Sequence, residues 1–215
     1  SVSIDGYDIL ENPNEAKMRI GYLPEHPPLY LDMTVKEYLG FIYDLKKVRF
    51  PKAPHIDEIC RLVKIDDVAG RLIKNLSKGY KQRVGIAQAL VGNPDVLILD
   101  EPTVGLDPKQ IIEIRSLITE LGKNHTVILS SHILSEIQAV CERVIVINHG
   151  TLIADGTPDE LSKKLSEDHS LSVRVAGPKT EVMKLLSTVP GVVTVTCTGL
   201  HEQSSNDYIV EPDGK

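Results

Sequence analysis

One stretch of the chain decides the fold: Asp95-Val96-Leu97-Ile98-Leu99-Asp100-Glu101-Pro102. Its apolar run is nearly continuous, which is typical of a strand that is buried on both faces of a parallel sheet. Asp100 and Glu101 follow this run at the point where the strand ends. We therefore predict a buried strand that brings two carboxylates to one edge of a sheet. Taken alone, the acidic pair would also fit a strand end that is simply surrounded by water.

Strands and helices alternate on the carboxyl side of this stretch. Helical spacing at 108–121 and 133–141 alternates with apolar runs at 126–130 and 143–147. Strands that are separated by helices pair in parallel, so the pattern predicts a doubly wound α/β sheet. Residues 150–158 then predict a hairpin followed by the start of another helix.

Three helical patterns lie between a short strand at 18–23 and the buried strand. They cover 34–45 behind Thr34 as a cap, a segment after Pro54, and 77–91. We expect these three helices to form a helical block that is inserted between two strands of the sheet.

The two ends of the chain carry smaller pieces. Residues 1–9 alternate like a strand and contain an Asp-Gly turn, which predicts a hairpin-like element. A polar run at 163–169 is interpreted as a linker. Beyond it, 171–215 predicts a strand–helix–strand appendage with a further strand at 208–210, an arrangement that resembles half of a ferredoxin-like unit.

The composition is that of a globular protein and excludes several function classes. Hydrophobic residues make up 41% and charged residues 25% of the 215, so neither a disordered nor a collagen-like chain fits. The net charge is -6 and aromatic residues make up only 4%, which argues against nucleic acid as a partner. The three cysteines show no metal-ligand spacing, and no run reaches the roughly 18 apolar residues of a membrane span.

The helix that begins near Ser77 is the second chemical signal. Leu76-Ser77-Lys78-Gly79-Tyr80 places a hydroxyl and an unobstructed glycine at a helix N-terminus. Backbone N–H groups and the positive end of the helix dipole favour a phosphate at such a position. Taken alone, Ser77 would be interpreted as an ordinary N-cap followed by a flexible glycine.

The order of these motifs resembles that of the ABC ATPase family. Leu76–Tyr80 resembles the signature motif and Leu99–Pro102 the Walker B motif, while Gly105–Pro108 resembles the D-loop and Ser131-His132 the switch histidine. The resemblance extends from residue 1 to about residue 161. It implies a P-loop NTPase-like (RecA-like) parallel sheet with an inserted helical subdomain, followed here by a small C-terminal α+β appendage. The sequence of residues 23–30 is most similar to that of exporter-type ATP-binding subunits that have a separate permease.

The resemblance implies ATP and Mg²⁺ as cofactors and assigns the catalytic groups. Glu101 would be the catalytic base that polarises the attacking water. His132 would contact the γ-phosphate as a hydrogen-bond donor. Asp100 would hold Mg²⁺. Glu25 stands where the family has a glutamine, and we expect its carboxylate to be a second Mg²⁺ ligand.

The resemblance also implies residues that bind nucleotide across a dimer. Ser77, Gly79 and Tyr80 would contact a nucleotide held by a second copy of the chain, and Asp107 would cross the interface to help shape the opposite site. Tyr80 departs from the usual glutamine, and Lys78 departs from the usual first glycine of the signature. Ser77 and Gly79 are therefore the safer assignments.

One family motif is absent. No Gly-x-x-x-x-Gly-Lys-[Ser/Thr] segment, the Walker A motif, occurs in the 215 residues. Gly177-Pro178-Lys179-Thr180 is a poor imitation, because proline removes a backbone N–H, and we interpret it as a helix start in the appendage. We expect the chain to be a truncated fragment that lacks the N-terminal part of the fold and has little ATPase activity of its own.

The predicted organisation has four parts. These are a partial ATPase core at 1–30, a helical signature subdomain at 31–92, the ATPase core with Walker B, D-loop and switch histidine at 93–165, and the appendage at 170–215. The implied function is to energise a membrane permease, by pairing with a second copy around ATP, at the cytoplasmic face of the membrane as a peripheral subunit. The alternatives are a non-transport ABC-type ATPase and a non-catalytic interaction fragment.

A set of apolar side chains near the start of the helical block has two interpretations. They could form a groove that receives a helix of the permease, or they could belong to the core. The set comprises Leu29, Tyr30, Leu31, Met33, Tyr38 and Phe41.

Overall fold

The strand predicted after Asp95 is the central strand of a parallel sheet, but it is fully buried on one face only, because Leu97 and Leu99 are buried whereas Val96 and Ile98 are partly exposed. It forms β4 (Val96–Asp100), with β3 (Ile20–Leu23) on one side and β5 (Thr126–Ser130) on the other. Both pairings are parallel, and Asp100 lies opposite Ser130 in the register. Parallel strands end at the same edge, so the residues that follow β3, β4 and β5 meet there.

The computed structural model describes residues 2–161, 171–201 and 205–212. By backbone contacts these divide into two units, Ser1–Cys141 and Glu142–Lys215. The division falls inside the predicted core segment 93–165, and the four-part organisation stays a prediction.

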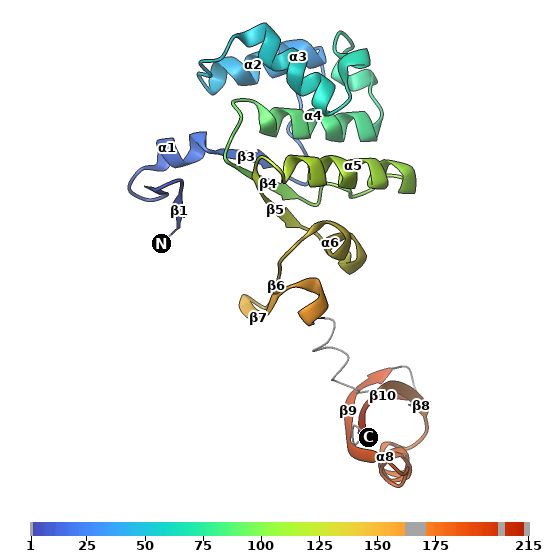
Figure 1. Cartoon of the computed structure of the whole chain (residues 1–215). Coiled ribbons are helices and arrows are strands. Elements are labelled where there is room, and N and C mark those ends of the chain that lie inside the picture. Colours follow the sequence, from blue (N-terminus) through green and yellow to red (C-terminus); the bar gives the residue numbers. More distant parts are fainter. Residues whose placement is uncertain (1, 162–170, 202–204, 213–215) are drawn as a thin grey trace. The chain divides into compact units, whose positions relative to one another are not determined.

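Three helices form the expected helical block of the first unit (Figure 1). They are α2 (Val35–Leu45), α3 (Lys52–Leu62) and α4 (Lys78–Leu90). The block starts with a capping box, in which the Thr34 hydroxyl accepts from the Glu37 N–H and the Glu37 carboxylate accepts from the Thr34 N–H. Helix α3 begins two residues before Pro54, earlier than predicted, because a proline in the first turn interrupts no helical hydrogen bond.

Helix α4 packs closely on β3 because two glycines leave room. A Cβ on Gly21 of β3 would lie 2.3 Å from the Ala89 carbonyl oxygen, and a Cβ on Gly85 of α4 would lie 2.6 Å from the Leu23 side chain. Any larger residue would push the helix off the strand. The helix that carries the signature motif is thereby fixed to the strand that precedes Glu25.

The remaining elements of the first unit complete its core. Helices α5 (Pro108–Leu121) and α6 (Leu134–Val140) follow β4 and β5 as predicted. The hairpin-like start forms β1 (Ser3–Ile4) and β2 (Tyr7–Asp8). Helix α1 (Pro13–Met18) was not predicted, because it is six residues long and buries only Ala16. Two 3₁₀ turns, η1 (Asp66–Val68) and η2 (Ile73–Asn75), connect α3 to α4.

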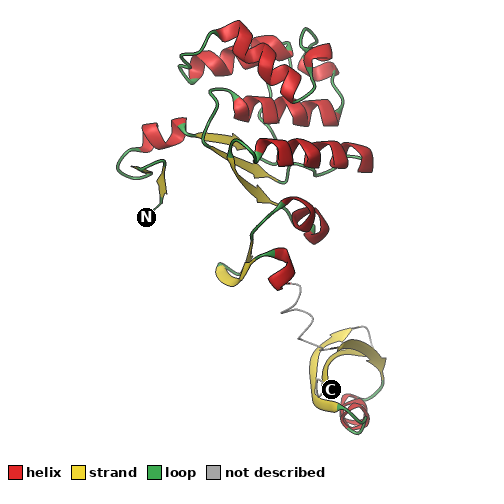
Figure 2. Ribbon diagram, in the orientation of Figure 1, coloured by secondary structure: helices red, strands yellow, loops and turns green. Residues whose placement is uncertain are grey.

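The second unit contains a hairpin and a small sheet (Figure 2). The hairpin pairs β6 (Val144–Asn148) with β7 (Thr151–Gly156) in antiparallel orientation. The strand predicted at 143–147 therefore belongs to this hairpin among the described residues and not to the parallel sheet. The sheet has the order β8 (Leu171–Ala176), β10 (Ser205–Pro212), β9 (Val192–His201), and β10 runs antiparallel to both neighbours.

Strands β8 and β9 are therefore parallel to each other, with β10 inserted between them and α8 (Lys179–Ser187) connecting them in sequence. The sequence predicted the strand–helix–strand order and the further strand at 208–210, but not that this strand lies between the other two. Gly177-Pro178 leads from β8 into α8, so this segment is a helix start. The predicted linker at 163–169 lies outside the described residues.

Helix α2 offers a matched test of the core. Leu39 is completely buried whereas Leu45, on the same helix, is 65% exposed. We expect Leu39→Ala to lower the free energy of unfolding by about 2–5 kcal/mol, because it leaves a cavity in the core. Leu45→Ala should change it by less than about 0.5 kcal/mol. Urea unfolding followed by circular dichroism measures both, and equal losses in the two variants would contradict the assigned packing.

Candidate functional site

The acidic pair at the end of β4 is held by the neighbouring strand. The Ser130 hydroxyl, at the end of β5, donates to Asp100 Oδ1 at 2.5 Å. The Glu101 N–H points to the Ser130 carbonyl and hydroxyl oxygens, both at 3.2 Å. Ser130 was not among the predicted site residues. It could have been identified, because it is the last residue of β5, the next strand along the chain after the one that ends in Asp100-Glu101.

Glu101 adopts an unusual backbone conformation. Its φ is 45°, in the left-handed region, which a residue with a side chain occupies at a cost on the order of 1–3 kcal/mol. One carboxylate oxygen, Oε1, lies 2.9 Å from His132 Nδ1. The other, Oε2, is buried and has no hydrogen-bond partner among the described residues. Buried carboxylate oxygens normally have a partner, so Oε2 is free to accept a proton donor from a ligand or a water.

His132 is positioned to work together with Glu101. Because the carboxylate can only accept, His132 Nδ1 carries the proton of their hydrogen bond. This hydrogen bond and the charge of Glu101 are the main causes that raise the pKa of His132, the charges of Glu136 and Glu25 add smaller contributions, and burial acts in the opposite direction. The raised pKa favours the imidazolium. In that form Nε2 also carries a proton, which it can donate to an anionic group.

Two buried side chains hold the loop after Glu101 in place, and neither was predicted from the sequence. The Thr103 hydroxyl, in the loop after Glu101, donates to the Glu136 carboxylate in the first turn of α6. Both residues are buried. A lone acid in a short helix gives no sequence signal for such a contact, because only the fold brings α6 to the loop after β4.

Glu25 lies at the same edge, in the segment after β3. Its side chain is about half exposed and lies 3.8 Å from His26, and its charge contributes to the raised pKa of His132. No group of three metal-ligating side chains occurs among the described residues. Mg²⁺ needs no such group, because it is usually held by one or two carboxylates together with phosphate oxygens and waters. Asp100 and Glu25 supply carboxylate oxygens of the kind that such a site uses, and their role as Mg²⁺ ligands stays a prediction.

The signature segment, residues 76–80, forms the start of α4. Ser77 is the N-cap, and its hydroxyl accepts from the Tyr80 N–H at 3.3 Å. Gly79 is buried beneath the side chain of Gln110. The Tyr80 hydroxyl donates to Asp67 at 2.9 Å, which also raises the pKa of Tyr80. The Tyr80 side chain is thus engaged within the helical block, so its predicted contact with nucleotide would have to come from its backbone.

The D-loop, residues 105–108, leads into α5. Asp107 is the N-cap of this helix, and its Oδ1 accepts from the Gln110 N–H at 2.9 Å. Within one chain, Asp107 therefore does what an ordinary helix start requires. Its predicted role in a second copy stays a prediction, as do the other site assignments.

Known proteins with similar sequences identify the family. The profile of the family described as ABC transporter matches residues 1–104. The ABC transporter ATP-binding protein NatA of Bacillus subtilis (strain 168) is 37% identical over 173 residues, which cover 78% of this chain and 70% of NatA. This chain belongs to the ABC transporter family.

Two further comparisons agree with the ABC transporter assignment. The bacitracin transport ATP-binding protein BcrA of Bacillus licheniformis is 40% identical over 76% of this chain, which spans only 53% of BcrA, about half of that relative. The solved structure of cbiO1 from Clostridium perfringens, part of the ABC transporter complex cbiONQ, matches with a TM-score of 0.67 and 27% identity, covering 86% of this chain and 70% of cbiO1. The predicted P-loop NTPase-like fold is confirmed.

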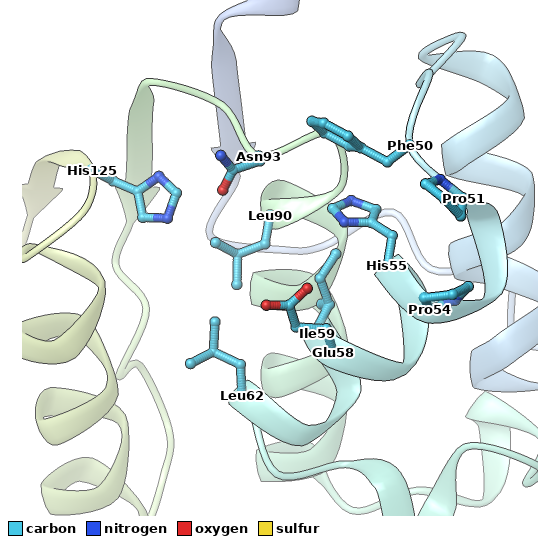
Figure 3. Close-up of a pocket in the computed structure, with 10 residues that line it drawn as sticks. All are labelled: Phe50, Pro51, Pro54, His55, Glu58, Ile59, Leu62, Leu90, Asn93 and His125. Carbon is cyan, nitrogen blue, oxygen red and sulfur yellow. The ribbon is translucent and has the colours of Figure 1, made fainter.

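A cavity of about 420 Å³ in this ABC transporter chain lies away from the acidic edge (Figure 3). Asn93 and His125, which line it, come just before β4 and β5, so it lies at the opposite ends of these strands. His55 Nε2 accepts from the Gly92 N–H at 3.0 Å, and His125 Nδ1 donates to the Pro94 carbonyl at 2.7 Å. Both histidines thus hold the connection between α4 and β4.

No helix within residues 2–161, 171–201 and 205–212 of this ABC transporter chain is both long and apolar enough to cross a membrane.

The Glu101–His132 contact predicts a defined pH dependence. Because hydrogen bonding to Glu101 is the largest cause of the raised pKa of His132, Glu101→Gln should lower that pKa. The imidazolium is present below the pKa, so the wild-type protein should keep the Nε2 proton to higher pH than the variant does. NMR titration of the His132 ring measures this shift. Glu120→Gln, which alters an exposed pair with Lys123, is the control. An unchanged titration in Glu101→Gln would show that the two side chains do not interact in solution.

Proposed function

We propose that this chain binds and hydrolyses ATP between two copies of itself and thereby drives a separate membrane permease. The observation that carries the proposal is the state of Glu101. Its backbone is held in the left-handed region, one carboxylate oxygen contacts His132, and the other is buried without a partner among the described residues. This is a carboxylate that is held in one orientation and has one buried oxygen available to a ligand or a water.

The residues at the acidic edge divide the work. Bound Mg²⁺ would neutralise charge on the phosphates, and Asp100, with Glu25 as second ligand, would hold it. Glu101 orients the attacking water through Oε2 and accepts its proton. His132 donates a hydrogen bond from Nε2 to the terminal phosphate, while its Nδ1 stays hydrogen-bonded to Glu101.

The second copy completes the site in this proposal. Ser77 and Gly79 present a hydroxyl and backbone N–H groups to the nucleotide that the other copy holds, and Asp107 shapes the opposite site. The proposal takes the phosphate-binding loop from sequence that these 215 residues do not contain.

The permease-facing surface is proposed around an exposed aromatic pair. Tyr30 and Phe41 are 50% and 37% exposed, their ring centroids lie 5.3 Å apart, and the neighbouring Leu31 is 48% exposed. Tyr38 is 1% exposed and its hydroxyl donates to Gln88. Tyr38 therefore belongs to the core, whereas Tyr30, Leu31 and Phe41 form an exposed apolar surface, which we propose as the docking site for a permease helix. We propose a permease of the exporter type, bound at the cytoplasmic face of the membrane. The name of BcrA, a bacitracin transport protein, supports a role in transport.

The catalytic assignment is tested in the natural full-length protein. We expect Glu101→Gln to lower the rate of ATP hydrolysis by about 100-fold or more, because the general base is lost. The variant should also accumulate as an ATP-bound dimer, measured by size-exclusion chromatography with light scattering. Glu120→Gln is the matched control. An unchanged rate in Glu101→Gln would remove Glu101 from the role of base.

The 215 residues alone should bind ATP poorly. Without a Walker A loop and its lysine, most contacts to the phosphates are lacking. Isothermal titration with Mg-ATP should therefore give no saturation below about 1 mM. Tight stoichiometric binding would show that residues of this chain hold the phosphates by themselves.

A further inference from the structure

The signature segment and the D-loop touch each other within one chain, through Gln110 and Gly79. A Cβ placed on Gly79 would lie 2.5 Å from Gln110 Nε2, 2.6 Å from Cδ and 2.7 Å from Oε1. Since three atoms of the amide are nearly equidistant from that point, the flat amide lies over the Gly79 backbone. Gly79 itself is buried. This contact explains why residue 79 is a glycine, because a side chain there would collide with Gln110.

Gln110 also bonds to the D-loop. Its backbone N–H donates to Asp107 Oδ1 at 2.9 Å, which fixes Gln110 in the first turn of α5. One residue therefore contacts the last part of the D-loop through its backbone and the signature segment through its side chain. A shift of either segment must move Gln110.

A second contact joins the same two segments, and here the side chain comes from the signature segment and the glycine from the D-loop. A Cβ on Gly105 would lie only 1.9 Å from Lys78 Nζ, so the lysine side chain of the signature segment rests on the D-loop backbone. Gly105 has a φ of +68°, where a glycine is also required by the backbone conformation. Each segment thus offers a glycine to a long side chain of the other.

Helices α4 and α5, which begin at these two segments, are also in contact one turn further along. Arg83 is 8% exposed, and it donates to Glu113 at 2.6 Å and to the Val63 carbonyl at 2.9 Å. Gly79 and Arg83 are four residues apart on α4, and Gln110 and Glu113 are three apart on α5. Such spacings place residues on one helix face. Two side-chain contacts one turn apart, Gln110 on Gly79 and Arg83 with Glu113, therefore join the starts of α4 and α5.

We propose that Gln110 is a positioning residue that fixes the D-loop to the signature segment of the same subunit, with Lys78 on Gly105 as the second contact. The inference rests on the proposed function, because only a nucleotide site shared between two copies uses both segments. Gln110 does not touch the reacting atoms. It acts through Gly79 and Asp107, so that both segments face the second copy as one rigid unit.

Three variants of the natural full-length protein test the proposal. Gln110→Ala removes the side chain over Gly79, Gln110→Met refills that space without the amide, and Lys109→Ala changes the exposed neighbour on the same turn as a control. The first readout is amide hydrogen exchange without nucleotide. Exchange in the signature segment and the D-loop should become at least about tenfold faster in Gln110→Ala, while exchange in β4 stays unchanged. Gln110→Met should restore slow exchange, and Lys109→Ala should match the wild type.

The second readout is steady-state ATP hydrolysis. Gln110→Ala should lower kcat by about 10-fold to 100-fold, because the shared site is misplaced, with KM changed by less than about twofold. Gln110→Met should recover most of kcat.

Two outcomes separate this inference from the function on which it rests. Wild-type exchange in Gln110→Ala, or a Gln110→Met variant no better than Gln110→Ala, would overturn the positioning role. Absence of ATP hydrolysis by the wild-type protein would instead overturn the proposed function, and the exchange measurement would still decide whether Gln110 joins the two segments.

Discussion

The parallel pairing of β4 with β3 and β5 is the constraint on which the rest of the first unit depends. It places three strand ends at one edge and puts Asp100 directly opposite Ser130. From this register follow the hydrogen bonds between Ser130 and the acidic pair and the approach of His132 to Glu101, and it brings the charge of Glu25 near enough to affect His132. A shift of β5 by one residue would turn Ser130 away from Asp100 and separate these groups.

The two residues of the signature segment that depart from the usual family residues, Lys78 and Tyr80, both contact other parts of the same chain. Tyr80 replaces a glutamine and bonds to Asp67, so it strengthens the helical block. Lys78 replaces a glycine and lies on Gly105, so it reaches the D-loop. The side chains at these two positions thus contact neighbouring parts of the same chain and help to hold the segment in place. In the proposed function, contact with the nucleotide is left to the Ser77 hydroxyl and the backbone.

Most of the fold could be predicted from sequence, because the elements have strong local signals. The run at 96–100 and the Thr34 cap determine their strand and helix with little help from the rest of the chain. The acidic pair and His132 were also found, since their order is a motif. Ser130, Thr103, Glu136 and Gln110 were missed, because each acts only through a neighbour that the fold supplies. Helix α1 was missed because it buries a single residue and has almost no apolar periodicity.

Glu25 poses the remaining electrostatic question, because a carboxylate stands where the family has a neutral amide. Together with Asp100, Glu101 and Glu136 it adds negative charge at an edge that is proposed to receive a triphosphate. Such an arrangement repels a bare nucleotide and requires cations. His132 is a titratable group at this edge, and the charge of Glu25 is the smallest of the causes that raise its pKa. In the proposed function Glu25 would have two compatible effects: it would favour the protonated form of the residue that contacts the phosphate, and it would add to the need for Mg²⁺ as the phosphate approaches.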